Sequence, residues 1–159
     1  MAKVPPVPPG FHTVTPYITV TKSAEAIDFY KRAFGAEEVF RMDGPGGKVI
    51  HAEIKIGDSV IMLSDEWPNS GVKAPINAGC CTASLMIYLP DVDASYTQAV
   101  NAGAKSTMPV EDQFWGDRAG QVTDPYGHKW MLATHVEDVS PADMERRQQE
   151  YFEKMRAAS

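Results

Sequence analysis

The sequence predicts an α+β domain that contains two copies of one β-α-β-β-β unit. Three observations support this fold class: strand-length stretches of apolar residues, one helical stretch in each copy, and repetition of this order at an offset of roughly seventy residues. FYKRAFGAEE aligns with TQAVNAGAKS, and the hairpin before SVIML aligns with the hairpin before HKWML. Because each copy has only one helix to cover its sheet, the copies must pack together to bury a core.

Length, composition and charge fit a single domain over residues 1–159, of which 43% are hydrophobic. The net charge is -6 and no cluster of Lys and Arg exists, so no nucleic-acid partner is expected. The apolar runs are strand-length, well short of the ~20 residues that cross a membrane. The N-terminal MAKVPPVPPGF lacks the apolar segment of a secretory signal. We therefore expect a cytoplasmic protein without a membrane partner.

The first copy spans residues 11–66. It begins with the strand TVTPYITV, in which Pro16 indicates an edge position or a bulge. A helix follows in KSAEAIDFYKRAF, with Ser23 expected as its N-cap and Gly35 as its end. The strands EEVFRMD, KVIHAEIKI and SVIMLSDE complete the copy, and the dipeptide GD makes a tight hairpin between the last two.

The second copy spans residues 80–136 and follows a Pro-, Gly- and Asn-rich linker over residues 67–79. It repeats the order of the first: TASLMIYL as a strand, DVDASYTQAVNAG as a helix with Asp91 as N-cap, and AKSTMPVED, DRAGQVTD and HKWMLATH as strands. Cys80 and Cys81 are adjacent, a spacing at which cysteines rarely bridge each other, so two reduced thiols are expected.

The tail, residues 137–159, predicts a final helix that Ser140 caps and Pro141 begins. Its apolar residues lie on one side, with one polar interruption at Gln148: Met144, Tyr151, Phe152 and Met155. A terminal helix of this kind docks on its own domain or on a second subunit. We favour the second option and expect a homodimer.

Sequence similarity extends this interpretation. The repeated order, with AIDFYKRAFGAEE after the first strand and DPYGHKWMLATHVEDVSP at the end, resembles the vicinal oxygen chelate superfamily. That group includes glyoxalase I, bleomycin-resistance proteins, extradiol dioxygenases and fosfomycin-resistance enzymes. The chain looks most like its PhnB-like, demethylubiquinone-methyltransferase-like branch. The resemblance covers residues 11–138 and implies that the two units form curved mixed sheets, a pair of half-barrels. One scaffold hosts unrelated chemistries, so the reaction stays open.

The resemblance also implies where a metal would bind. Enzymes of the superfamily hold a divalent cation with a histidine or glutamine on each first strand and a glutamate on each last strand. These positions fall at Thr15, Ser84, Met62 and Met131, with Ile61 as the alternative to Met62. Divalent cations prefer carboxylate oxygen and imidazole nitrogen. The resemblance therefore implies that the usual metal site is absent, and no cofactor is expected.

Two polar groups are candidates for chemistry. His51 and Glu53 share one face of a strand, where they act as a substrate-binding or acid–base pair or form an ordinary solvated face. In EDQFWGDRAG, Trp115 and Arg118 suit a planar or anionic ligand. The alternative is that Arg118 pairs with an aspartate such as Asp117 to fix a loop, while Trp115 fills the core.

Apolar residues complete the expected lining of an inner cavity. Tyr17 and Tyr88 follow the first-strand metal positions with the same parity and should point inward. Four further side chains are expected beside them: Phe40, Met62, Met86 and Met131. Such a lining suits an aromatic ligand, although buried tyrosines and methionines are also ordinary core. In the turn DPYGHKW, Asp124 and His128 are expected to form and cap the hairpin.

Three functional hypotheses follow. The first is a metal-free binding protein of the bleomycin-resistance type, which holds a small aromatic or amphipathic molecule in its inner cavity. The second is a lyase, isomerase or dioxygenase with a relocated site at His51 and Glu53. The third is a dimeric scaffold with a closed cavity, whose function lies on its surface.

Overall fold

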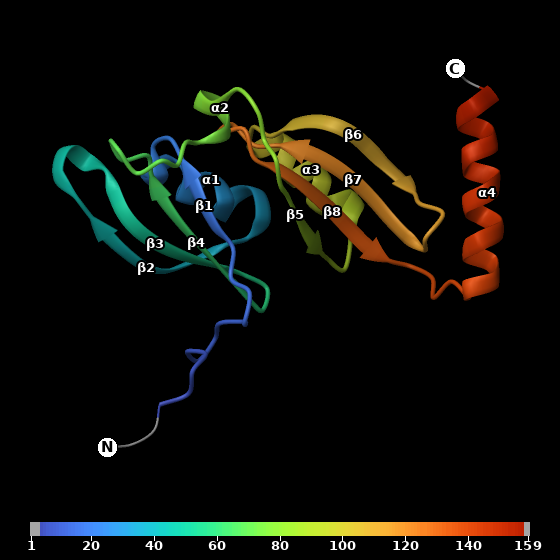
Figure 1. The fold of residues 1–159 in the computed structure, drawn as a ribbon, viewed down its shortest axis with the longest axis horizontal. Helices are drawn as coiled ribbons and strands as arrows, with labels where there is room; N and C mark the ends of the chain where they lie inside the picture. Colours follow the sequence, from blue (N-terminus) through green and yellow to red (C-terminus); the bar gives the residue numbers. More distant parts are fainter. Residues whose placement is uncertain (1–3, 158–159) are drawn as a thin grey trace.

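The computed structural model describes residues 4–157, so the first three residues of the expected lead-in and the last two of the tail lie outside it. The chain forms two four-stranded sheets side by side, and the helices between them cover one face of each sheet (Figure 1). Sheet A has the strand order β1-β4-β3-β2 and sheet B has the order β5-β8-β7-β6. The predicted α+β duplication is confirmed. Both sheets remain open.

The first module runs through β1 (Tyr17–Val20), α1 (Ser23–Phe34), β2 (Glu37–Asp43), the 3-10 turn η1 (Pro45–Gly47), β3 (Val49–Ile56) and β4 (Ser59–Asp65). The linker contains one short helix, α2 (Pro75–Ala78). The second module runs through β5 (Ser84–Tyr88), α3 (Val92–Ala102), β6 (Lys105–Asp112), β7 (Asp117–Thr123) and β8 (Lys129–His135). The final helix is α4 (Pro141–Ala157). In both modules the first and last strands pair in parallel, and the other pairs are antiparallel.

The start of the first module differs from the prediction in two respects. Strand β1 begins at Tyr17 and not at Thr13, because Pro16 has no N–H to donate to a ladder, although its position at the edge of sheet A is as Pro16 indicated. Ser23 is the first residue of α1 and not its N-cap, so that expectation is wrong. The cap position is Lys22, which has no side-chain cap, and the carboxylate of Asp65 accepts the N–H of Ser23 at 3.0 Å instead.

Helix α3 starts as predicted. The side chain of Asp91 caps it by accepting the N–H of Ala94 at 3.0 Å. Thr134 on β8 accepts a further N–H, that of Val92, at 2.9 Å. Each helix is therefore tied at its N-terminus to the last strand of its own module.

One continuous core joins the two modules. Three aromatic residues of α1, Phe29, Tyr30 and Phe34, are buried against Tyr126 and Trp130 of the second module. The rings of Phe34 and Trp130 lie 4.7 Å apart between centroids, and those of Tyr30 and Trp130 lie 5.4 Å apart. Aromatic contacts of this kind add stability beyond that which comes from the buried apolar area alone. The two modules thus share one hydrophobic core.

The turn DPYGHKW is the polar centre of this junction. One carboxylate oxygen of Asp124 accepts the hydroxyl of Tyr30 and the indole N–H of Trp130, both at 2.8 Å. The other oxygen accepts two backbone N–H groups of its own turn, one of them from His128. The imidazole of His128 reaches the carbonyl of Thr19 on β1 at 2.9 Å. Burial, followed by the nearby Asp124 carboxylate, raises the pKa of Tyr30. The predicted hairpin turn therefore also holds the modules together.

Helix α4 projects beyond the outer end of sheet B (Figure 1). It begins at Pro141 as predicted, and the hydroxyl of Ser140 accepts the N–H of Asp143 at 3.2 Å. Its Tyr151 ring contacts Phe114, with 5.1 Å between centroids. No residue of α4 is buried. Among the described residues, no helix is both long and apolar enough to cross a membrane.

Candidate functional site

The open face of each sheet is the face turned away from α1 and α3. On the open face of sheet A, the structure brings together all five of the predicted site residues of the first module: the lining residues Tyr17, Phe40 and Met62 and the acid–base candidates His51 and Glu53. Tyr17 on β1 and Glu53 on β3 both lie opposite Met62 on β4, and Phe40 on β2 lies opposite Glu53. His51 follows two positions away from Glu53 on the same face. Alternation along each strand sets the face, and the pairing register brings the residues of the four strands together.

These polar side chains form a hydrogen-bonded chain. The two ring nitrogens of His51 lie 3.2 Å from the hydroxyl of Tyr17 and 3.3 Å from a carboxylate oxygen of Glu53. A neutral ring that donates to Glu53 from Nε2 accepts the tyrosine proton at Nδ1. The Tyr17 and His51 rings meet edge to face at 5.5 Å. The arrangement can bind a polar ligand group or relay a proton to it.

The open face of sheet B holds four more of the predicted residues. Met86 and Tyr88 come from β5, and Met131 on β8 lies opposite Met86. Trp115, in the loop between β6 and β7, donates its indole N–H to Asp117 at 3.0 Å. Trp115 and Met131 are partly buried, whereas Met86 and Tyr88 are exposed. The predicted lining is therefore divided between two faces.

Arg118 lies on the opposite face of sheet B, towards α3. Its guanidinium makes two hydrogen bonds with Asp93, at 2.7 and 2.8 Å, and one with Asp112 at 3.0 Å. These bonds, first those to Asp93 and then the one to Asp112, raise the pKa of Arg118. The contacts correspond to the alternative in which an Asp–Arg pair fixes the loop, with Asp93 and Asp112 as partners in place of Asp117.

Asp117 is the centre of a polar group that strand patterns alone do not reveal. It is 3% exposed, and its carboxylate accepts hydrogen bonds from the hydroxyl of Tyr88 at 3.1 Å and the indole of Trp115. It also lies 2.8 Å from Nδ1 of His135, whose Nε2 lies 2.9 Å from Asp138. The register of β7 and β8 sets Asp117 opposite His135, and alternation along each strand does not specify that register.

The hydrogen bonds shift the protonation of this group. Burial alone would raise the pKa of Asp117, but the bonds from His135, Trp115 and Tyr88 together hold it below its usual value. The bond to Asp138, then the bond to Asp117, raises the pKa of His135 above 6.5. Desolvation of the hydroxyl and its bond to Asp117 raise the pKa of Tyr88. His135 between two carboxylates is therefore favoured as imidazolium.

The four positions at which the superfamily's enzymes bind a metal carry unsuitable donors. Thr15 precedes β1, and its hydroxyl donates to the carbonyl of His12 at 2.9 Å. Ser84 is the first residue of β5, and Met62 and Met131 offer only thioether sulfur. Over residues 4–157, no three His, Cys, Asp or Glu side chains lie where they could hold a metal ion. This donor set does not fit the divalent cation of those enzymes.

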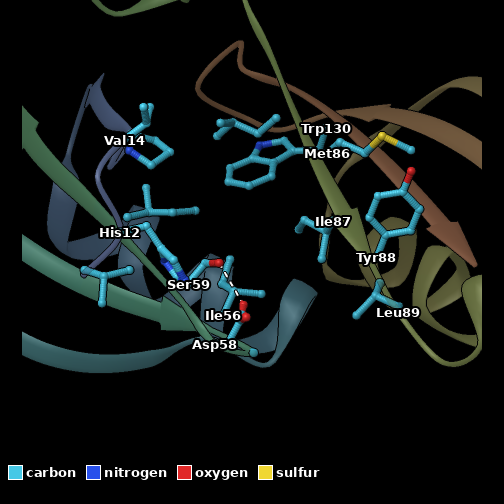
Figure 2. A pocket seen from close by; sticks show the side chains of 15 residues that line it. His12, Val14, Ile56, Asp58, Ser59, Met86, Ile87, Tyr88, Leu89 and Trp130 are labelled. Carbon is cyan, nitrogen blue, oxygen red and sulfur yellow. Dashed lines mark hydrogen bonds between the residues drawn. The ribbon is translucent and has the colours of Figure 1, made fainter. Parts of the chain in front are cut away.

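A cleft of about 520 Å³ lies between the modules (Figure 2). The segment before β1, the β3–β4 hairpin and β5 form its walls, and Trp130 contributes to its lining. Its polar residues are His12, Asp58 and Ser59. Of the predicted lining residues only two reach it, Met86 and Tyr88. The single inner cavity expected from the sequence is thus replaced, within one chain, by two open faces and a cleft between modules.

Comparison with known proteins identifies the family. A sequence model described as the Glyoxalase/Bleomycin resistance protein/Dioxygenase superfamily matches residues 10–132. Uncharacterized protein Mb0911c of Mycobacterium bovis is 42% identical over 130 residues, which cover 80% of this chain and 86% of that protein.

Solved structures agree with this match. The Arabidopsis thaliana gene product At5g48480 has a TM-score of 0.64 at 27% identity, covering 77% of this chain and 98% of the other. TioX from Micromonospora sp. ML1 has a TM-score of 0.62 at 24% identity, covering 79% of this chain and 99% of TioX. At this identity the similarity concerns the fold alone. The sequence match and the duplicated sheets lead to one conclusion: this chain belongs to the glyoxalase/bleomycin resistance protein/dioxygenase superfamily.

Proposed function

We propose that this protein binds a small aromatic or amphipathic molecule without a metal ion, on the open face of sheet A. The observation that carries this proposal is the exposure of large apolar side chains on this face. Tyr17 is 55%, Phe40 45% and Met42 47% exposed. Exposed apolar patches bordered by polar groups are characteristic of binding sites.

The polar chain on this face supports a ligand that donates hydrogen bonds. The contact between His51 and Glu53 is long, at 3.3 Å, so the partly buried carboxylate keeps acceptor positions for another donor. The rings of Tyr17 and Phe40 flank His51 and provide flat apolar surface. A planar aromatic cation matches both features.

We also infer a homodimer. Small-molecule sites bury about 70–90% of their ligand's surface, whereas one open sheet covers a ligand from one side only. A second copy that faces sheet A would supply the other wall, and α4 exposes further apolar residues for such contacts. Sedimentation velocity on the full chain should give twice the mass of one chain at micromolar concentration. A monomer at all concentrations would contradict the dimer.

We place the chain in the PhnB-like branch of the superfamily. The support is the pair of sequence segments AIDFYKRAFGAEE and DPYGHKWML. A structure titled putative 3-demethylubiquinone-9 3-methyltransferase, PhnB protein, from Bacillus cereus shares the fold, with a TM-score of 0.60 at 21% identity and coverage of 77% and 99%. Binding of small molecules does not depend on this placement.

Calorimetry with ethidium, a planar aromatic cation, tests the proposal on the full chain. We expect saturable binding that Tyr17→Ala weakens at least about tenfold, since aromatic anchors carry much of such binding energy. The control is Val100→Ala, which truncates an exposed apolar residue of α3 and should leave binding unchanged. Absence of saturable binding, or equal loss in both variants, would overturn the proposal.

A second candidate is an acid–base enzyme, because His51 links Tyr17 to Glu53 in one hydrogen-bonded chain. A lyase or isomerase of this type would exchange a ligand C–H proton with solvent. Proton NMR in D₂O should then show exchange in a bound carbonyl compound, and His51→Gln should abolish the exchange while binding persists. Binding without exchange would leave the protein as a binder only.

A further inference from the structure

The open face of sheet B carries a built polar group that differs from the one on sheet A. Asp117 is buried, and each of its three partners donates towards it from a different element: Tyr88 from β5, Trp115 from the β6–β7 loop and His135 from β8. Three side chains from three different elements therefore surround one carboxylate. Such a carboxylate orients a histidine that it contacts and favours its imidazolium form, in which both ring nitrogens donate.

The second nitrogen of His135 is available to a ligand. It lies 2.9 Å from Asp138, whose side chain is fully exposed and makes no other hydrogen bond or ion pair with the described residues. The backbone between them is fixed, because Val136 and Glu137 both donate to the carbonyl of Gly116. Rotation of one exposed side chain is therefore enough to free the imidazole, without any backbone movement.

Asp138 also indicates which chemical group this position accepts. It places a carboxylate oxygen in line with Nε2, so a ligand carboxylate can take the same place. Aromatic surface lies alongside: Tyr88 is 60% exposed, and the Trp115 ring packs against Phe114 with centroids 5.1 Å apart. An anionic group on an aromatic ring fits the donor and the adjoining rings together.

We propose that the open face of sheet B is a second binding site, for aromatic carboxylates, in which Nε2 of His135 donates to the ligand carboxylate in place of Asp138. Asp117 is a positioning residue that holds the imidazole through Nδ1. This site differs from that on sheet A in both residues and ligand charge. It stands whether or not the first site binds a cation.

Benzoate is the probe, and titration of the full chain by calorimetry and by ¹⁵N NMR of the histidine rings is the measurement. We expect a Kd of about 1 mM or below, the affinity that so small a ligand reaches. The Nε2 signal of His135 should shift on binding. Cyclohexanecarboxylate, which has the same charge and no aromatic ring, should bind several-fold more weakly.

Three variants separate this site from a nonspecific anion effect. His135→Gln should lower benzoate affinity at least tenfold, and Asp117→Asn should lower it while shifting the Nδ1 signal of His135 seen by NMR. Asp138→Asn removes the competing carboxylate and should raise affinity several-fold. Glu145→Gln removes the same charge from α4 and should have no effect.

Two results would overturn the proposal. One is an equal gain in affinity from Asp138→Asn and Glu145→Gln, which would mean that only net charge matters. The other is benzoate binding that leaves the His135 nitrogen signals unchanged. Loss of ethidium binding in Tyr17→Ala, with benzoate binding intact, would show that the two sites act separately.

Discussion

Sheets A and B share one register, so their open faces can be compared position by position. In each sheet a methionine on the last strand lies between a residue of the first strand and a residue of the third: Tyr17, Met62 and Glu53 in sheet A, and Met86, Met131 and Gln121 in sheet B. Two residues before Glu53 stands His51, and two before Gln121 stands Ala119. Equivalent backbone thus carries acid–base groups in one module and neutral groups in the other.

The polar groups of the second module have moved along the sheet. They lie at the end where β7 begins and β8 finishes, around Asp117 and His135. The comparison teaches that a duplicated unit can keep its strand register while its side chains diverge, because open-face residues contribute little to the core. We therefore expect opposite ligand preferences on the two faces.

The turns between the last two strands differ as well. In the first module the turn is the dipeptide Gly57–Asp58, which is exposed. In the second it is the five-residue stretch from Asp124 to His128, and its aspartate is buried between modules. One turn faces solvent and the other holds the domain together.

The largest expected difference in the free energy of unfolding is between substitutions in these two turns. Asp124→Ala leaves the hydroxyl of Tyr30 and the indole N–H of Trp130 buried without their acceptor, so we expect the free energy of unfolding to fall by about 3–5 kcal/mol. Asp58→Ala removes an exposed carboxylate whose partner, the hydroxyl of its neighbour Ser59, is an exposed contact, and should change stability little. Urea unfolding of both variants measures the difference. Equal stabilities would refute the assignment of Asp124 as the junction.

The helix caps offer the next comparison. Asp65 accepts two backbone N–H groups, from Ser23 and Val49, whereas Thr134 accepts one, from Val92. We expect Asp65→Ala to cost about 2–3 kcal/mol and Thr134→Ala about 1 kcal/mol. The same unfolding assay ranks them, and the reverse order would contradict the contacts described.

A third change makes the first face resemble the second. The double variant His51→Ala with Glu53→Gln should weaken ethidium binding about tenfold, since it removes charge-assisted hydrogen bonding. Benzoate affinity should stay within about twofold, because its site lies on sheet B. Calorimetry with both probes reads this directly, and a parallel loss of both affinities would mean that the faces are coupled.

The smallest expected effect is a pH dependence from His135, which faces Asp117, Asp138 and, through Asp117, Tyr88. Because the pKa of His135 is raised in the folded state, the protonated ring stabilises the fold fully below pH 6.5, its ordinary pKa. This stabilisation disappears as the pH rises through the pKa of the folded state. The destabilisation caused by His135→Ala should therefore be larger at pH 5.5 than at pH 9. Urea midpoints at both values test this, with His12→Ala as the control, and a pH-independent loss would contradict it.

Local patterns in the sequence account for much of the fold and for the first face. The offset repeat, the Asp91 cap and the Gly35 helix end each depend on neighbouring residues, and all three are found in the structure. Strand alternation likewise sets His51 and Glu53 on one face. These features follow from backbone geometry over a few residues.

What the sequence did not reveal depends on contacts between distant residues. Asp65 bonds to Ser23 at the start of α1, and these two residues are 42 positions apart in the sequence. Arg118 and Asp93, which also bond, are 25 positions apart. Asp117 and His135, 18 residues apart, meet through the register of β7 and β8. Such pairings require the strand register and the packing of helices, which local periodicity does not specify.

The two modules are connected along the chain by one linker, while buried hydrogen bonds and aromatic contacts hold them together. The bond between Tyr30 and Asp124 and the contact between the rings of Phe34 and Trp130 join the modules directly, and the linker packs on the same turn, where Ile76 donates its N–H to the carbonyl of Tyr126. A protein cleaved after Asn69 would therefore yield two complementary fragments that reassemble on mixing. Each fragment brings its own recognition surface, so halves from different relatives can be recombined to pair one specificity with another.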